Sequence, residues 1–421
     1  MKVLIVGGGG RENAIAWAAS KSKYVEQIFV APGNAGTAQI AENVNISDKD
    51  IRSLASFAEK KGIDLTIIGP ETPLAIGIVD YFQRRKLRIF GPTLKAAQIE
   101  SSKIFSKKFM REYNIPTASY KTFDNPEDAI EFLEKREFPI VIKTDGLAAG
   151  KGAIIAKNIT EAKDAILHMM IEQNFGQAGK RVVIEEFLPG TEVSLMAITD
   201  GTDIVPLVPA MDYKRALDGN LGPNTGGMGA IAPHPLVEQH QKDYIVEHVL
   251  KPTVDGLRHM GHPFKGLLYA GVMLTERGPK VLEFNCRFGD PETQVVLPLL
   301  KTDFIEMLLY AIEDRLSEFE AEWYDQKALC VVMASGGYPK RYRKGFEITG
   351  LHEAAKEATV FHAGTTLKSD KIITNGGRVL GITALGDTLK QAANKTYRAV
   401  KHIEFNKSFY RGDIGSPFIK K

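Results

Sequence analysis

The first hundred residues alternate short apolar runs with helical stretches, and this alternation constrains the fold more than any other feature of the chain. The apolar runs have strand length and end in glycine or proline, whereas the segments between them suit helices. Strand, helix, strand at this spacing predicts a parallel, doubly wound sheet. The expected strands lie at residues 2–7, 27–33, 65–70 and 88–92, and the expected helices start near residue 12 and cover about 50–60 and 74–85.

The chain changes character after about residue 100. A helix over 101–116 ends ahead of a proline, and a compact α+β unit follows from about 120 to 190. Longer strands and a loop rich in glycine, proline and asparagine at 218–229 come next, and a last block of strands contains one helix near 388–403. We therefore expect an α/β and α+β multidomain protein, because 421 residues exceed what one ordinary core accommodates.

Composition is typical of soluble globular proteins. The chain has 44% hydrophobic and 25% charged residues, and no segment has the uninterrupted apolar length of a membrane span. Met1 runs directly into the first apolar strand, which leaves no room for a signal peptide, so we expect a cytoplasmic protein. The two cysteines, Cys286 and Cys330, lie in apolar strand patterns, which argues against a disulfide framework or a thiolate metal site.

The charge distribution favours small-molecule partners. The net charge of +3 arises from 54 basic and 51 acidic residues spread along the chain, and no basic run is long enough for a nucleic-acid surface. We therefore expect no nucleic-acid or membrane partner. We also expect a monomer, or at most a weak dimer.

The segment "EFNCRFGDPETQ", which begins at Glu283, carries a polar alternation at the end of an apolar strand. Successive side chains alternate between faces, so Glu283, Asn285 and Arg287 share one face and the apolar residues take the other. Such a face is commonly solvated. Here the following turn adds Asp290 and Glu292. A carboxylate, an amide oxygen and a guanidinium in one row suit a hard cation and the phosphate oxygens it carries, so the segment predicts a magnesium–nucleotide site.

Four glycines, Gly7 to Gly10, follow the first strand and precede a helix, where phosphates commonly bind. The dinucleotide pattern G-x-G-x-x-G fails, because its third glycine falls on Glu12 and the second strand ends in "APGN" rather than in an acid that would hold a ribose. The run therefore indicates a phosphate or another closely approaching ligand, not a nicotinamide cofactor.

The segment "DGLAAGKG", residues 145–152, fails as a P-loop. Three residues rather than four separate Gly146 from Gly150, and Gly152 stands where Ser or Thr would hold Mg²⁺. What remains is a glycine-rich loop directly after Lys143, whose ammonium ends a strand. This arrangement suits a loop lying over a triphosphate beside a paired point charge, and it also suits a surface hairpin with an exposed lysine.

The segment "IEEFLPGTEVS" places Glu185 at a strand end and Glu192 after a Leu-Pro-Gly turn. It fits either an exposed connection between domains or a nucleoside site, in which a carboxylate binds the ribose diol and backbone groups bind the adenine edge. None of the motifs contains a Ser/His or Cys/His arrangement for nucleophilic catalysis.

Taken in order, five motifs resemble those of the ATP-grasp superfamily, and more closely those of the phosphoribosylamine-glycine ligase family. They are "GPETPL", "ESSKIFSKKFM", "DGLAAGKG", "GPNTGGMGA" and "EFNCRFGDPETQ". The resemblance covers the whole chain, and "RFGDPETQ" is its most specific part. It implies an ATP-dependent carbon-nitrogen ligase that joins glycine to 5-phosphoribosylamine through a glycyl phosphate. The products would be glycinamide ribonucleotide, ADP and phosphate, in de novo purine biosynthesis.

The resemblance also implies a division into domains. Residues 1–102 would form a Rossmann-like substrate domain, and 103–122 with 193–326 would form the main ATP-grasp domain. Residues 123–192 would form the small mobile ATP-grasp domain, and 327–421 a small C-terminal α+β domain.

For the nucleotide site, the resemblance implies that Lys103 and Lys143 pair with phosphates and that residues 146–152 form a mobile loop over them. Glu283 and Asn285 would hold Mg²⁺ or Mn²⁺. The implied ATP-binding residues are Lys103, Lys143, Gly146, Gly150, Lys151, Gly152, Glu185 and Leu188 near adenine, Glu186, and Glu192 on the ribose.

For the reaction, the resemblance implies that Arg287 stabilises the transferring phosphoryl group, assisted from a facing loop by Lys214 and Arg215. Asp290 would orient the amine. The implied substrate-binding residues are Gly9, Gly10 and Arg11 near the sugar phosphate, Glu71 facing it, Asp212, Asn224, Gly226, Gly227 and Asp290.

Two departures from the family pattern stand out. Asn13 occupies a position where many members have His, so a role for that imidazole does not transfer. Other ATP-grasp enzymes carry an acidic metal ligand on the preceding strand, where this chain has Leu274.

Two other functions are compatible with part of these motifs. One is a sister ATP-grasp enzyme that activates bicarbonate or formate, which differs only in its amine and carboxylate pockets. The other is a nucleotide-binding regulator without turnover, which the retention of Glu283, Asn285 and Arg287 disfavours.

Overall fold

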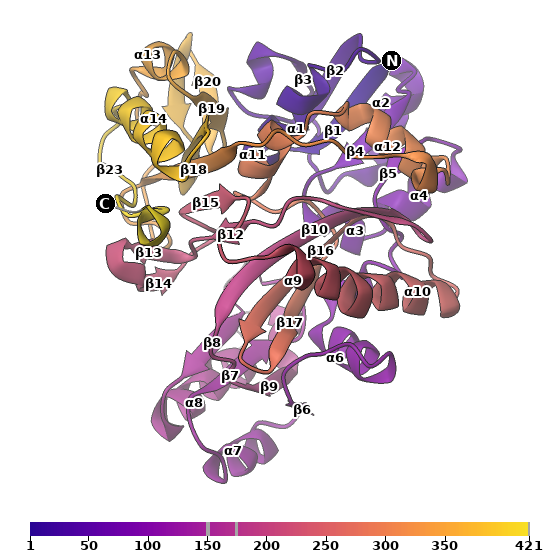
Figure 1. The fold of residues 1–421 in the computed structure, drawn as a ribbon, viewed down its shortest axis with the longest axis vertical. Coiled ribbons are helices and arrows are strands. Elements are labelled where there is room, and N and C mark those ends of the chain that lie inside the picture. The colour runs from indigo at the N-terminus through magenta and orange to yellow at the C-terminus, as the bar shows by residue number, and fades with distance from the viewer. Residues whose placement is uncertain (149–151, 173–175, 420–421) are drawn as a thin grey trace.

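The computed structural model describes residues 1–148, 152–172 and 176–419. Figure 1 shows the N-terminal and C-terminal sheets side by side, with the central sheet leading away from both toward a smaller sheet at the opposite end. No helix in these described ranges is long and apolar enough to cross a membrane.

The first hundred residues form the predicted parallel sheet, in the order β3-β2-β1-β4-β5. Every neighbouring pair is parallel. The strands are β1 (Lys2–Gly7), β2 (Gln27–Pro32), β3 (Glu42–Asn43), β4 (Leu65–Ile68) and β5 (Ile89–Phe90). The helices are α1 (Gly10–Ala19), α2 (Ile51–Lys61), α3 (Glu71–Ala75) and α4 (Ile78–Arg84).

The single helix predicted over 74–85 is wrong in one respect, because the segment holds two helices. Gly77, at φ +88°, has a left-handed conformation between α3 and α4. A glycine adopts this conformation without a Cβ penalty, so it can end one helix and begin the next.

The small sheet at the far end is antiparallel, in the order β6-β9-β7-β8. Its own hydrophobic cluster includes Ile142, Val182 and Ile184. Two short helices, α5 (Gln98–Ser101) and α6 (Lys103–Glu112), precede it, and Ser102 caps α6 by accepting from the Phe105 amide. Its elements are β6 (Tyr120–Phe123), α7 (Pro126–Glu134), β7 (Ile140–Thr144), β8 (Ala153–Ala156), α8 (Ile159–Ile166) and β9 (Val182–Glu186).

The central sheet is antiparallel, in the order β11-β10-β16-β17. Two hydrophobic clusters run from the N-terminal sheet into it, one through Leu4 and Leu268 and the other through Val3 and Leu267. The elements are β10 (Thr191–Asp200), β11 (Ile204–Pro206), α9 (Gln239–Ile245), α10 (Lys251–His259), β16 (Lys265–Thr275) and β17 (Gly278–Asn285).

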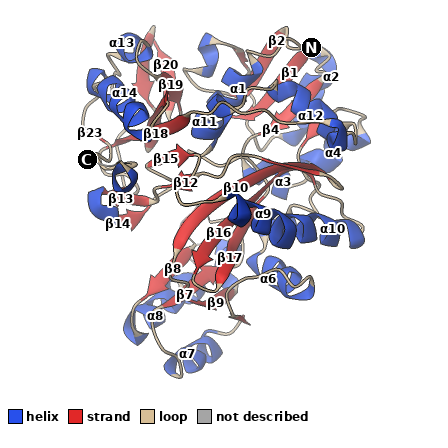
Figure 2. Ribbon diagram, viewed as in Figure 1, coloured by secondary structure: helices blue, strands red, loops and turns tan. Residues whose placement is uncertain are grey.

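The C-terminal sheet has the order β12-β15-β18-β22-β19, and β23 adds to β18. Two of its strands, β12 (Met211–Asp212) and β15 (Gly229–Ala232), come from the chain ahead of the last block. The other elements after residue 292 are α11 (Thr293–Val296), α12 (Phe304–Ile312), β18 (Lys327–Ser335), α13 (Leu351–Ala355), β19 (Thr359–His362), β20 (Thr365–Lys368), β21 (Lys371–Thr374), β22 (Arg378–Gly386), α14 (Leu389–His402) and β23 (Ser408–Phe409). Of these, β20 and β21 form a separate two-stranded sheet, and α12 contacts β10 and β16 of the central sheet. Figure 2 shows α13 and α14 on the outer side of this sheet.

The loop predicted at 218–229 is only partly a loop. A hairpin of β13 (Arg215–Leu217) and β14 (Leu221–Asn224) occupies its first half. The turn residues that suggested a loop form the tight connection, in which Gly219 has a positive φ of +67°.

Candidate active site

One face of the central sheet carries polar side chains. Glu283 pairs with Gly271 and Asn285 with Tyr269 across β16 and β17. Tyr269 in turn contacts Ser194 of β10, with 2.6 Å between their hydroxyl oxygens. The alternation predicted over 283–288 is present, because its three apolar residues are buried and its three polar residues stay partly accessible. The face is therefore a partly enclosed polar surface and not a freely solvated one.

Glu283 is surrounded by positively charged side chains. Burial opposes ionisation, but nearby positive charges, led by Lys214 and Lys143, hold the pKa of the Glu283 carboxyl below its ordinary value. The carboxylate itself makes no hydrogen bond to a described residue. Asn285 Oδ1 accepts from Arg287 Nη2 at 3.2 Å. An ionised carboxylate without a hydrogen-bond donor and a neighbouring amide oxygen are the oxygen donors that a hard cation prefers.

The predicted metal ligands do not belong to a larger cluster of acidic, histidine or cysteine side chains in the described part of the chain. Within residues 1–148, 152–172 and 176–419, no group of three or more His, Cys, Asp or Glu side chains is placed to hold a metal ion. Leu274 pairs with Thr191 and Pro279 in the sheet and contributes no ligand.

Arg287 is held between two carboxylates of the N-terminal part of the chain. Its Nε lies 3.2 Å from Glu71 Oε2, and its Nη2 lies 3.5 Å from Glu100 Oε1. Burial disfavours the guanidinium charge, but Glu100 and Glu71 raise the pKa of Arg287 above its ordinary value. Glu100 also accepts from the Cys286 amide at 2.7 Å. The arginine is thus charged and fixed in orientation beside the polar face.

Lys143 is buried, with 6% of its surface exposed, so the alternative of an exposed lysine on a surface hairpin is wrong. Its Nζ donates to Glu185 Oε2 at 3.0 Å and to the Leu282 carbonyl at 2.9 Å. That carbonyl is available because the β16–β17 register shifts between Glu283 and Val281, leaving Leu282 unpaired.

Asp145 ties the start of the glycine-rich loop to α6. Its Oδ1 accepts from the Ser102 hydroxyl at 2.9 Å and from the Ile104 amide at 3.1 Å. Lys103 Nζ donates to the Gly146 carbonyl at 3.0 Å, and burial lowers the pKa of Lys103. The structure therefore brings Lys103 to the loop that the sequence places near phosphates.

The loop is described only at its two ends. Gly146 has a positive φ of +145°. At the other end, the Gly152 carbonyl accepts from the Thr144 amide at 2.8 Å. Gly150 and Lys151 lie outside the described residues.

The carboxylates of Glu185 and Glu186, at the end of β9, have different surroundings. Glu185 is 3% exposed, and its Oε1 atom is buried without a hydrogen-bond partner among the described residues. Glu186 is exposed and accepts from the Ser119 amide at 2.8 Å, and its Oε1 lies 3.0 Å from Lys280 Nζ. Leu188 is buried. Glu185 is thus available to the site, whereas the Glu186 side chain is engaged at the surface.

Glu192 and Lys214 form an ion pair at the edge of the polar face. Burial opposes the charge of Lys214, but Glu192 and then Glu283 raise its pKa above its ordinary value. Lys214 therefore lies close to Glu283, as expected for a residue that assists from a facing loop.

The four-glycine run packs against the turn after β17. A Cβ on Gly9 would lie 3.6 Å from Asp290 Oδ2, and one on Gly10 would lie 2.6 Å from Gln294 Nε2, so the Gln294 side chain would have to shift. Gln294 Nε2 also donates to Asp290 Oδ1 at 2.7 Å. Arg11 Nη1 donates to the Phe288 carbonyl at 3.0 Å. The glycines thus allow the N-terminal backbone to approach this acidic turn.

Asp212 lies on the other side of the same turn. A Cβ on Gly227 would lie 2.6 Å from Asp212 Oδ1 and 2.4 Å from Pro291 Cδ. Burial, followed by the charge of Glu292, raises the pKa of Asp212 well above its ordinary value. Asp212 Oδ1 also has no hydrogen-bond partner in the described part of the chain. This carboxyl is therefore an unused hydrogen-bonding group beside the predicted substrate residues.

Two predicted residues lie in the β13–β14 hairpin. Arg215 Nη1 donates to the Gly222 carbonyl at 2.8 Å, and Asn224 pairs with Arg215 across the strands. Asn224 is exposed. The side-chain hydrogen bond of Arg215 stays within the hairpin, whereas its backbone carbonyl accepts from Arg411 Nη1 at 3.2 Å.

Asn13 anchors the C-terminal sheet. Its side-chain oxygen accepts from the His362 amide at 2.7 Å, and both residues are buried. The position at which the family resemblance implied His therefore makes a contact between α1 and β19.

Sequence reasoning missed a buried network behind the polar face. The Tyr269 hydroxyl donates to Glu292 Oε1 at 2.6 Å, and Ser194 Oγ donates to the same atom at 3.2 Å. The acidic turn drew attention to Glu292, but nothing in the local pattern pairs it with Tyr269, because the two meet only through the strand register.

Arg378 was missed for the same reason. From β22 it donates to the Asp290 carbonyl at 2.6 Å and contacts the Asp290 carboxylate at 3.2 Å. It also donates to the Gly226 carbonyl. Burial opposes ionisation of Asp290, but Arg378 leads the charges that hold the pKa of its carboxyl below the ordinary value. The C-terminal sheet therefore contributes a residue to the site.

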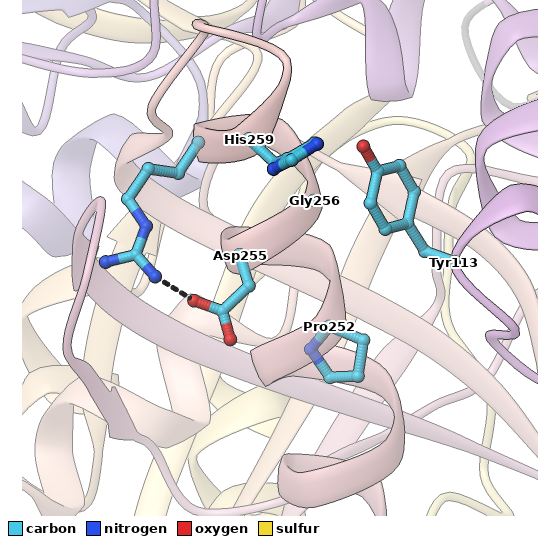
Figure 3. A pocket seen from close by; sticks show the side chains of 6 residues that line it. Tyr113, Pro252, Asp255, Gly256 and His259 are labelled. Atoms are coloured by element: carbon cyan, nitrogen blue, oxygen red, sulfur yellow. Dashed lines mark hydrogen bonds and ion pairs between the residues drawn. The ribbon is translucent and has the colours of Figure 1, made fainter.

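A surface pocket of about 370 Å³ lies elsewhere, between the end of α6 and α10, and holds none of the predicted site residues. Figure 3 shows Tyr113 facing α10. Asp255 forms an ion pair with Arg258, whose N···O distance is 2.6 Å. Tyr113 packs over Gly256, where a Cβ would lie 2.9 Å from its ring.

Comparison with protein families gives three matches in chain order. Residues 1–100 match the phosphoribosylglycinamide synthetase N domain, 101–293 its ATP-grasp (A) domain, and 328–417 its C domain.

Individual relatives agree with these matches. The chain is 52% identical to phosphoribosylamine-glycine ligase of Caldanaerobacter subterraneus subsp. tengcongensis, over 99% of this chain and 100% of that protein. It is 51% identical to the trifunctional purine biosynthetic protein adenosine-3 of Gallus gallus, over 98% of this chain and 42% of that protein. The crystal structure of phosphoribosylamine-glycine ligase from Thermotoga maritima has a TM-score of 0.87 and 35% identity, covering 98% of this chain and 100% of that one.

Proposed function

Since this chain belongs to the phosphoribosylglycinamide synthetase family, we propose that it joins glycine to 5-phosphoribosylamine with cleavage of ATP. The products are glycinamide ribonucleotide, ADP and phosphate, in de novo purine biosynthesis. The observation that carries this proposal is the match of all three family domains, in order, across the chain. The polar face with Glu283, Asn285 and Arg287 supports it as a place for phosphoryl transfer.

An amide forms from a carboxylate only when a leaving group is installed. A glycine carboxylate oxygen attacks the γ-phosphorus of ATP, the bond to the β-γ bridging oxygen breaks, and ADP leaves glycyl phosphate behind. The amine of phosphoribosylamine then attacks the glycyl carbonyl carbon, the carbon–oxygen bond to phosphate breaks, and the amine loses a proton. No side chain acts as a nucleophile, so positioning, charge neutralisation and exclusion of water are the protein's contribution.

Arg287 is the residue we assign to the transferring phosphoryl group. The Arg287 guanidinium is charged, and Glu71 and Glu100 hold it in place, so its orientation is set before the substrate binds. Lys143 and Lys103 neutralise the triphosphate, and Lys214 assists from the facing loop. We leave Arg215 out of this group, because its guanidinium is engaged in the hairpin.

The residues at the polar face fit a divalent cation. Glu283 is kept ionised and has no hydrogen-bond donor in the described chain, and Asn285 adds an amide oxygen. These two residues would hold Mg²⁺, and Mn²⁺ suits the same oxygen ligands. When bound, the ion neutralises charge on the β- and γ-phosphates.

The nucleoside is assigned to the residues from the end of β9 to the start of β10. The Glu185 carboxylate and the Leu188 backbone bind adenine, and Glu192 binds the ribose, with the loop at 146–152 over the phosphates. The sugar phosphate is assigned to Gly9, Gly10 and Arg11.

Asp290 and Asp212 are assigned to the amines, because both carboxyls border the glycine-lined turn. We further propose the division into domains at 102, 122, 192 and 326, with the chain acting as a cytoplasmic monomer.

The test is ATP consumption and product formation with each substrate omitted in turn. We expect ADP, phosphate and glycinamide ribonucleotide in equal amounts only when ATP, glycine and phosphoribosylamine are all present. Turnover with bicarbonate or formate in place of glycine would identify the sister enzyme. Nucleotide binding without turnover under every combination would identify the regulator.

The glycyl phosphate makes a separate prediction. With ATP labelled in the β-γ bridging oxygen, glycine alone should cause the label to exchange into the non-bridging β positions, because ADP forms reversibly before the amine arrives. Nuclear magnetic resonance of the phosphates measures the exchange. Product formation with no glycine-dependent exchange would contradict the intermediate.

Lys143→Met should weaken ATP binding by about tenfold or more, because it removes a charge from the triphosphate site. The fold should persist, since Lys107 still neutralises Glu185. Calorimetric titration of ATP measures the affinity. Lys157→Met is the matched control, since Lys157 is exposed directly after β8. An affinity equal to that of the wild type would remove Lys143 from the site.

A further inference from the structure

A second buried lysine stands behind the nucleotide residues, and no motif or comparison assigns it a role. Lys107, on α6, is only 2% exposed. Its Nζ lies 3.1 Å from Glu185 Oε2 and donates to Thr117 Oγ1 at 2.7 Å. A lysine is almost never buried to this extent unless it is paired, so the position demands a specific partner.

The partner of Lys107 is the Glu185 carboxylate, of which one oxygen is paired and the other has no hydrogen-bond partner among the described residues. Glu185 Oε2 takes both ammonium groups, from Lys107 and from Lys143 at 3.0 Å. Glu185 Oε1 is buried with no hydrogen-bond partner among the described residues. A buried acceptor without a partner costs free energy, so Oε1 is available to a hydrogen-bond donor from a ligand.

The Lys143 ammonium already donates to Glu185 and to the Leu282 carbonyl, so pairing with a triphosphate competes with its contact to Glu185. Under the proposed function, Lys143 turns toward the nucleotide when ATP binds. Glu185 would then be a buried carboxylate without a counter-ion, unless a second cation remained in place. Lys107 is that cation, because its other contact is to Thr117 and not to the nucleotide loop.

We propose that Lys107 is a positioning residue for the adenine site: it keeps Glu185 ionised and oriented while Lys143 serves the phosphates, so that Oε1 accepts from the 6-amino group of adenine. This inference rests on the proposed nucleotide site. By keeping Glu185 ionised, Lys107 would maintain the preference of the site for a 6-amino over a 6-oxo purine. The reason is that the Glu185 carboxylate accepts from an amino group and repels a carbonyl oxygen.

Hydrogen bonds connect Lys107 to the strand that carries the polar face. Thr117 Oγ1, which accepts from Lys107, donates to the Val281 carbonyl at 2.6 Å on β17. Val281 precedes Glu283 by two residues on the same strand. Lys107 is therefore fixed to the strand that carries the phosphate-transfer residues, and it holds Glu185 in a constant position relative to them.

The electrostatics of the pair agree with this role. Burial lowers the pKa of Lys107 to about 8, while Glu185 acts in the opposite direction. Lys143 also lowers the pKa of Lys107, so moving Lys143 onto phosphate strengthens the charge that Lys107 offers to Glu185.

The test compares nucleotide affinity in charge-removing and charge-keeping variants. Lys107→Met and Lys107→Gln remove the charge, and Lys107→Arg keeps it. Lys108→Met is the matched control, because Lys108 is the exposed neighbour on the same helix. Calorimetric titration of ATP and of inosine triphosphate needs no turnover, so its result is independent of whether the ligase reaction occurs. Thermal unfolding establishes which variants fold.

We expect the charge-removing variants to weaken ATP binding by about tenfold or more and to reduce the preference for ATP over inosine triphosphate. In the ligase reaction, the KM of these variants for glycine should stay within about twofold of the wild-type value, because the proposed glycine site does not include Glu185. Lys107→Arg should recover most of the preference, and Lys108→Met should match the wild type. A folded Lys107→Met or Lys107→Gln protein with wild-type affinity and preference would overturn the inference, as would a loss of stability with no change in either.

Discussion

Replacing Arg287 by lysine should lower the turnover number by on the order of a hundredfold or more and leave the Mg²⁺ requirement nearly unchanged. The guanidinium contacts Glu71 through Nε, and it contacts both Glu100 and Asn285 through Nη2. Lysine keeps the positive charge but carries it on a single nitrogen. It therefore cannot bind two phosphate oxygens while it also keeps these partners. Initial rates at saturating substrates measure the effect.

Arg277→Lys is the control for this substitution. Arg277 is exposed in the turn between β16 and β17, on the same hairpin as the site. Exposed substitutions of this kind usually change stability by only about half a kcal/mol. If Arg287→Lys and Arg277→Lys were equally active, Arg287 would have no part in phosphoryl transfer.

Glu283→Gln should raise the Mg²⁺ concentration needed for half-maximal rate by on the order of tenfold or more. Glutamine keeps the shape of the side chain and removes its charge. Because nearby cations hold the pKa of Glu283 below its ordinary value, the wild-type carboxylate is ionised at neutral pH and the full charge is lost. Calorimetric titration of the metal in the presence of a non-hydrolysable ATP analogue measures the same change without turnover.

Glu276→Gln is the matched control for the metal site. Glu276 is exposed in the same β16–β17 turn. A Glu283→Gln protein that needed no more metal than Glu276→Gln would show that the cation is held elsewhere.

The local sequence pattern was enough to predict the N-terminal parallel sheet and the buried face of the segment 283–288. Alternating apolar runs predicted β1, β2, β4 and β5, since a parallel sheet requires buried strands joined by helices. The period of two also predicted which side chains of 283–288 are buried. The helix over 74–85 was misjudged, because Gly77 acts through a left-handed conformation that periodicity does not reveal.

The residues that hold the site in place could not be predicted in this way. Lys107 meets Glu185 and Arg378 meets Asp290 across long stretches of chain. Such pairs depend on how strands align and how domains pack, and neither partner carries a local signal. The family resemblance supplied the roles of residues such as Glu283, because family motifs record long-range contacts that one sequence does not display.

The most direct test of the central claim is a Mg²⁺ titration of initial rates, at saturating ATP, glycine and phosphoribosylamine, for the wild type, Glu283→Gln and Arg287→Lys. If these residues form the floor of the phosphate-transfer site, the Glu283→Gln curve shifts to higher Mg²⁺. The Arg287→Lys curve keeps its midpoint and reaches a much lower plateau. Two curves that both follow the wild type would contradict the account, because a merely solvated face predicts that outcome.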